Sequence, residues 1–192
     1  MSRGDFILLL RLGVLILLSC FSIAGIAEDK AITKEALLAL QKEIQQDLDL
    51  IVDKGGRYAH KQIVESGVIN PFAISVSETG DFMVLAPRQD QNKQATISQK
   101  VSELRRLLKE SVDKGGITAA AVFVSAKVPV KGTSTEKEGI AIELEHQSGI
   151  SNLRFVPFEL TNDRLKLEKP IDKFKPLVFF KDAQKQNNNK KN

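Results

Sequence analysis

The chain has 192 residues, of which 42% are hydrophobic and 27% are charged, a balance typical of one globular domain and not of a disordered or fibrous protein. Its one Cys excludes a disulfide within the chain and a zinc site built on several cysteines. The net charge of +4 belongs to the C-terminal end, because residues 28–163 hold 17 basic and 20 acidic side chains. This mildly acidic body argues against nucleic acid as a partner.

Residues 1–27 have the order of a secretory signal peptide. Arg3 and Arg11 make the start basic, an apolar run follows over residues 12–21, and small residues precede Glu28. This order predicts cleavage after Ala27 and a periplasmic or secreted protein.

Two alternatives to cleavage after Ala27 remain open. The residues Leu17-Leu18-Ser19-Cys20 resemble a bacterial lipobox, in which Cys20 would be acylated and become the new N-terminus. Counted from Phe6 across Arg11, the apolar segment approaches the length of a membrane span, so it could also stay as an uncleaved anchor.

The first half of the mature chain predicts two helical stretches and a hairpin. Apolar residues at 3–4 spacing indicate a helix from Thr33 to about Lys54, which Gly55-Gly56 should end. A second, short helix is expected over residues 57–66. Strands are predicted over residues 72–76 and 82–86, joined by a turn over residues 78–81.

The second half predicts one helix followed by successive strands. Thr96 and Gln99 have the spacing of a capping box at the start of a helix that Lys114 and Gly115-Gly116 close. Strands are expected over 117–130, 140–146 and 152–160, with an edge strand at 164–168 and a loop at 131–139. The result is an α+β fold with a single antiparallel sheet in the order α-β-β-α-β-β-β, and with helices packed on it. Profilin-like and roadblock-like folds share this order, a likeness that carries no function.

The sequence Val-Asp-Lys-Gly-Gly occurs twice, at residues 52–56 and 112–116. Both copies are interpreted as helix ends, where Gly takes the left-handed conformation and Lys favours the helix dipole. A duplicated loop that presents backbone amides to an anion is the alternative.

The end of the chain combines an apolar segment with a basic tail. Residues 177–180 read Leu-Val-Phe-Phe and are expected to dock on the domain or on a partner, with residues 28–180 forming the single domain. Residues 181–192 are Lys, Gln and Asn in the main, and we expect a disordered tail that could contact anionic lipid headgroups.

Few residues suit catalysis. The sequence contains no Gly-x-Ser-x-Gly elbow, no Walker-type phosphate loop and no dinucleotide fingerprint, and no catalytic residue, cofactor or metal site is assigned. Alternation places His146 on the apolar face of its strand, where it could bind a ligand or hydrogen-bond a turn, and places Glu143 and Glu145 on the opposite face. Those two carboxylates would suit glycoside hydrolysis or a binding surface, but a solvated strand face is more common. His60 is expected to face solvent on its helix.

Residues 69–160 resemble a group of small uncharacterised bacterial proteins with no established activity. The likeness rests on Asn70-Pro71-Phe72-Ala73, the turn Gly80-Asp81, Leu144-Glu145-His146 with Gly149, and Phe155-Val156-Pro157-Phe158. Where the group tends to have Pro-Tyr, this chain has Pro157-Phe158, which removes a phenol. The resemblance implies no catalytic or binding role.

These observations favour an exported bacterial envelope protein that is a non-catalytic binding domain for a protein or a small ligand. One alternative is a small periplasmic hydrolase with His146 as its base. Another is an inhibitor- or immunity-type protein that presents Glu143 and Glu145 to a basic target.

Overall fold

The computed structural model describes residues 33–87, 95–129, 134–161 and 164–181. The chain divides into two compact units, residues 1–46 and 47–192, and helix α2 (Lys34–Ser66) runs through the boundary. In the first unit, the side chain of Thr33 accepts a hydrogen bond from the backbone N–H of Ala36 at 3.2 Å, so α2 begins where the sequence predicted. The predicted signal peptide with Cys20 and residues 182–192 of the predicted tail lie outside the described residues.

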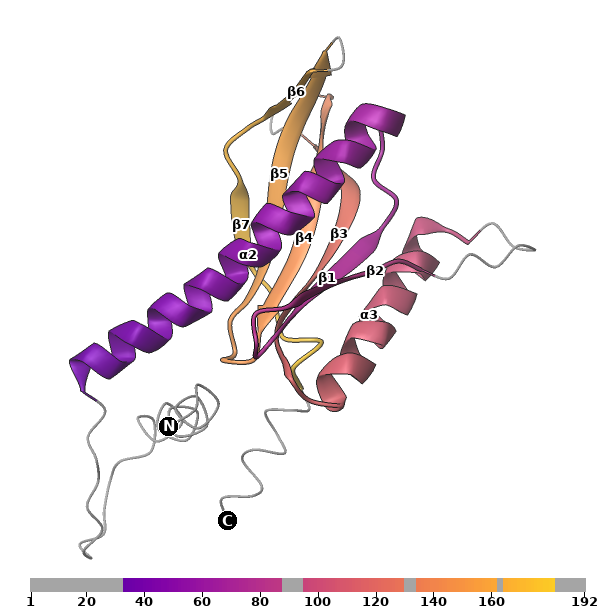
Figure 1. The fold of residues 1–192 in the computed structure, drawn as a ribbon. Coiled ribbons are helices and arrows are strands. Elements are labelled where there is room, and N and C mark those ends of the chain that lie inside the picture. Colours follow the sequence, from indigo (N-terminus) through magenta and orange to yellow (C-terminus); the bar gives the residue numbers. More distant parts are fainter. Residues whose placement is uncertain (1–32, 88–94, 130–133, 162–163, 182–192) are drawn as a thin grey trace, which may run out of the picture. The chain divides into compact units, whose positions relative to one another are not determined.

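The second unit is built on one antiparallel sheet (Figure 1). In chain order its elements are β1 (Phe72–Ser77), β2 (Phe82–Leu85), α3 (Ile97–Asp113), β3 (Ile117–Pro129), β4 (Glu136–His146), β5 (Ser151–Thr161), β6 (Arg164–Leu167) and β7 (Ile171–Phe174). The strands lie side by side in the order β2-β1-β3-β4-β5-β6, and β7 pairs with the other half of β5. The described residues therefore confirm the α+β class and the order α-β-β-α-β-β-β.

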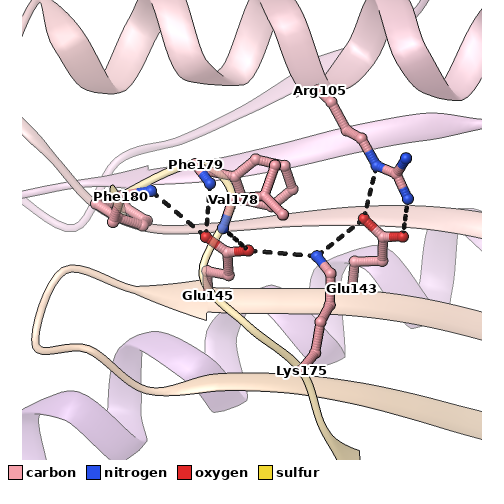
Figure 2. Close-up of polar contacts among 7 residues, drawn as sticks. All are labelled: Arg105, Glu143, Glu145, Lys175, Val178, Phe179 and Phe180. Carbon is pink, nitrogen blue, oxygen red and sulfur yellow. Dashed lines mark hydrogen bonds and ion pairs between the residues drawn. The ribbon is translucent and has the colours of Figure 1, made fainter. Parts of the chain in front are cut away.

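Within the second unit, residues 47–66 of α2 and helix α3 pack on opposite faces of the sheet (Figures 1 and 2). On one face, Tyr58 of α2 meets Phe72 edge-on, and Phe72 stacks on Phe123 with ring centroids 4.8 Å apart. The other face packs against α3 through a buried cluster of small and large apolar side chains: Ala73, Leu104, Leu108, Val112, Ala120, Val122, Phe179 and Phe180. Ala73 on β1 and Ala120 on β3 are small, which allows α3 to pack closely on these strands.

The prediction that α2 ends at Gly55-Gly56 is wrong, because α2 continues unbroken to Ser66. A Cβ added at Gly55 would overlap the ring of Phe123, so this glycine permits close packing of the helix on β3. The second Val-Asp-Lys-Gly-Gly copy is a helix end as predicted, since Gly115 and Gly116 follow α3 with φ of 87° and 82°. The first copy therefore lies inside a helix and is not a loop, whereas the second copy ends a helix.

The predicted capping box at the start of α3 is confirmed. The Thr96 side chain accepts the backbone N–H of Gln99 at 3.3 Å, and the Gln99 side chain accepts the backbone N–H of Thr96 at 2.8 Å. Two differences concern the strands: β4 begins at Glu136, inside the predicted loop, and β7 was not predicted. Neither segment shows the alternation of apolar residues that indicates a strand, so the sequence did not reveal them. Each one is extended because it pairs with a long neighbouring strand.

Candidate functional site

His146 ends β4 on the α2 face of the sheet, as the alternation predicted, and its side chain is 5% exposed. Its Nδ1 accepts the backbone N–H of Ser148 at 3.0 Å and lies 2.8 Å from the Ser148 hydroxyl oxygen. Its Nε2 lies 3.5 Å from a carboxylate oxygen of Asp47 on α2. Because Nδ1 is an acceptor, the ring proton is on Nε2 and faces Asp47.

The group Ser148, His146 and Asp47 contains the residue types of a hydrolytic triad, but its arrangement is that of a turn cap. The backbone N–H of Ser148 takes the Nδ1 lone pair that a nucleophile would need. The same four-residue turn is closed by a 3.0 Å hydrogen bond from the backbone N–H of Gly149 to the carbonyl of His146. His146 therefore anchors the β4–β5 turn to α2, and hydrogen bonding to a turn is one of the two roles that the sequence offered for it.

Glu143 and Glu145 lie on the α3 face of β4, and the expectation of a solvated strand face is wrong. The side chain of Glu145 is fully buried and that of Glu143 is 12% exposed. Both are covered by α3 and by the C-terminal strap, which we define as residues 175–180. The register explains why: the two residues pair with Val122 and Ala120 of β3, the strand on which α3 packs.

Two basic side chains neutralise these carboxylates (Figure 2). Arg105 of α3 forms a two-point ion pair with Glu143. Lys175 lies between the carboxylates, with Nζ 3.1 Å from Glu143 and 3.3 Å from Glu145. Burial by itself would raise the pKa of Glu143, but the hydrogen bonds and charges of Arg105 and Lys175 outweigh it and hold that pKa below its ordinary value.

The carboxylate of Glu145 holds the backbone of the C-terminal strap (Figure 2). It accepts the N–H groups of Val178 at 2.8 Å, Phe179 at 2.7 Å and Phe180 at 3.4 Å. These bonds and Lys175 compensate the cost of removing the charge from water. Phe179 and Phe180 are 0% and 1% exposed, so the predicted docking of residues 177–180 on the domain is confirmed.

Glu143 and Glu145 therefore have a structural role: they hold α3 and the C-terminal strap against β4. Their oxygens are occupied by Arg105, Lys175 and the strap, which leaves neither carboxylate free to act as acid or nucleophile. The acidic surface that an inhibitor- or immunity-type protein would need at these positions is absent, because both side chains are covered. His60, by contrast, is exposed on α2 as expected.

Strand β2 is the unexpected surface. It lies at one edge of the sheet, and among the described residues it pairs with β1 alone. Phe82, Met83 and Val84 are 47%, 47% and 39% exposed. Because successive side chains alternate, Phe82 and Val84 project from the α2 face and Met83 from the α3 face, so β2 presents apolar side chains on both sides. On the α2 face, Nζ of Lys54 lies 5.3 Å from the centroid of the Phe82 ring.

The opposite edge of the sheet carries charged residues beside its exposed apolar side chains, which are Leu167, Ile171 and Phe174. β6 carries Arg164 and Lys166, and β7 carries Asp172 and Lys173. Charged residues at an edge discourage pairing with other chains, whereas the four residues of β2 include no charge and no Pro. The run Phe-Met-Val-Leu was recognised as a strand from the sequence, but its edge position depends on the strand order and was missed.

Comparison with protein-family models, with curated proteins and with solved structures found no match. In the part of the chain that the structure describes, no three His, Cys, Asp or Glu side chains are grouped so that they could hold a metal ion. No helix among the described residues is both long and apolar enough to span a membrane.

Proposed function

We propose that the protein is an exported, non-catalytic domain of the bacterial envelope that binds an extended segment of a protein along β2. The observation that carries the proposal is the apolar, uncharged edge formed by Phe82, Met83 and Val84. Location in the envelope rests on residues 1–27, with a lipid anchor at Cys20 or an uncleaved N-terminal anchor as the alternatives.

An edge strand binds a partner by extending the sheet. The partner's backbone supplies hydrogen bonds, and its alternating side chains lie on the two faces. A partner at β2 would cover Phe82 and Val84 on one face and Met83 on the other, so its contacting side chains should be apolar as well. The rigid support is already in place, because β1 is buried over five of its six residues.

The hydrolase alternative has weaker support. His146 is almost fully buried, and its Nδ1 is used by the turn that follows it. If His146 were a catalytic base, His146→Gln and Ser148→Ala should each remove activity and leave the unfolding midpoint unchanged. We expect instead that His146→Gln lowers the midpoint, because it removes the turn cap.

Photo-cross-linking in the native envelope tests the proposal. A photoreactive amino acid placed at Met83 should give a discrete adduct, and sequencing should find the linked residue in an extended apolar segment. The same label at Phe174, which is 87% exposed on β7 at the other edge, is the matched control. Equal labelling at both positions, or no adduct at Met83, would contradict a docking site on β2.

A further inference from the structure

We infer that a second copy of this chain occupies the β2 edge, in a symmetric dimer whose two sheets join through antiparallel β2 strands. The inference rests on the proposed function, since it names the occupant of the same edge. Its evidence is the hydrogen-bond phase of β2, the absence of charge on that strand and the charge on the opposite edge.

Two residues of β2 direct their backbone N–H and C=O groups away from β1, toward the edge of the sheet where another strand could pair. In the β1–β2 hairpin, the N–H of Ser77 donates to the carbonyl of Asp81 at 2.9 Å. In an antiparallel pair, hydrogen-bonded positions alternate with non-hydrogen-bonded ones. The register pairs Val76 with Phe82, so the N–H and C=O groups of Phe82 and of Val84 point away from β1.

A two-fold axis uses both of these residues at once. If Phe82 pairs with Val84 of the partner subunit, symmetry pairs Val84 with Phe82 of the partner subunit, and each pair can exchange two hydrogen bonds. Met83 then lies on the axis, opposite Met83 of the partner subunit, at a non-hydrogen-bonded position where side chains come closest. The four exposed backbone groups are satisfied with no other segment.

Charge distinguishes a second copy from other arrangements of this chain. Two β2 strands place no ionisable side chains of their own opposite each other, because Phe82–Leu85 contains none. A cation beside this edge is Lys54 of α2, whose Nζ lies 5.3 Å from the centroid of the Phe82 ring. Pairing β2 with β6 or β7 of another copy would instead cover Arg164, Lys166, Asp172 or Lys173 with apolar side chains. The contact therefore closes as a dimer and does not extend into a filament.

The size of the contact predicts a weak dimer. Four residues extend about 14 Å at the usual rise per residue. Four residues of strand are far fewer than the roughly 20–30 residues per partner that form a standard stable interface. Association should therefore depend on concentration, and it should be favoured where export or anchoring holds many copies on one surface.

The decisive test places charges at Met83, the residue on the two-fold axis. Self-association is measured by sedimentation equilibrium of the purified protein from micromolar to millimolar concentration. Wild type should show a reversible monomer–dimer equilibrium. Met83→Lys alone and Met83→Glu alone place like charges opposite each other, and each should weaken self-association by at least about tenfold. An equimolar mixture of the two variants should dimerise again, because Lys then faces Glu. Phe174→Lys, the matched control on the other edge, should dimerise like wild type.

The possible failures are distinguishable. A wild-type protein that stays monomeric at millimolar concentration, or a mixture that fails to restore the dimer, overturns the inference. If the two variants do not fold, the NMR chemical shifts of the Phe82 and Val84 backbone amides are followed in the wild-type protein as its concentration rises. Shifts that change with concentration support the dimer, and shifts that stay constant overturn the inference. Cross-links from Met83 to a different protein would leave the proposed function standing without the dimer, whereas no cross-link at all would refute both.

Discussion

Alanine substitution of two adjacent glycines in α2 should change stability in opposite directions. Gly55 and Gly56 lie in the interior of the same helix, where Gly is disfavoured relative to Ala. A Cβ at Gly56 meets nothing within 4 Å, whereas a Cβ at Gly55 would overlap three atoms of the Phe123 ring. The same chemical change is therefore tested in open space and in a filled contact.

The magnitudes follow from these surroundings. Gly56→Ala should raise the free energy of unfolding by about 0.5–1 kcal/mol, which is the difference in helix propensity. Gly55→Ala should lower it by about 1–3 kcal/mol, because Phe123 is fully buried and stacked on Phe72, so neither ring can turn aside. At about 2–4 °C per kcal/mol, Gly55→Ala should lower the Tm by roughly 2–12 °C.

Urea and thermal unfolding followed by circular dichroism measure both changes. The double variant Gly55→Ala/Phe123→Leu provides the control, because the smaller side chain removes the overlap and adding Gly55→Ala to it should cost much less. Two results would refute the reasoning: a stabilised Gly55→Ala protein, or equal costs of that substitution in the presence of Phe123 and of Leu.

Three further predictions concern the strap and the caps. The pKa of Glu143 lies below its ordinary value of 4.5, so the ionised carboxylate contributes its full stabilisation above pH 4.5 and loses it as the pH falls through the lowered pKa. Glu143→Gln should therefore have a lower free energy of unfolding than wild type at neutral pH, and this difference should narrow in acid. Urea titrations at several pH values measure it. Phe179→Ala should cost about 3–5 kcal/mol, and Val178→Ala, at a 38% exposed neighbour that keeps its backbone bond to Glu145, less than about 1 kcal/mol; similar losses would contradict the docking of the strap. Thr96→Ala should cost about 1 kcal/mol, and an unchanged urea midpoint would mean that the capping box adds nothing.

Local signals predicted most of the elements correctly. The capping box of Thr96 and Gln99 and the glycines after Lys114 located α3, because helix ends depend on hydrogen bonds between near neighbours in the chain. The alternation of β4 placed His146 on one face and Glu143 and Glu145 on the other for the same kind of reason. Where long-range packing decided the outcome, as at Gly55 against Phe123, the local signal failed.

The environment of the candidate residues was less predictable. Alternation gave the correct side of the sheet for Glu145, but burial of this residue depends on α3 and on a strap more than 30 residues later in the chain. No local pattern indicates that three successive backbone N–H groups will meet a carboxylate so far away in sequence. The solvated interpretation was therefore the reasonable expectation, and the fold overturned it.

The sequence by itself determined the α+β class, the order of the elements, the cap of α3 and the docking of Leu177–Phe180, because periodicity, capping and an apolar run act over a few residues. The tertiary structure alone decided that α2 passes through Gly55-Gly56, that Glu143 and Glu145 fasten the strap, and that Phe82–Leu85 lies at an open edge. Each of these depends on which strands and helices become neighbours. The arrangement of neighbouring strands and helices minimises the free energy of the whole chain, so it cannot be inferred from any short segment.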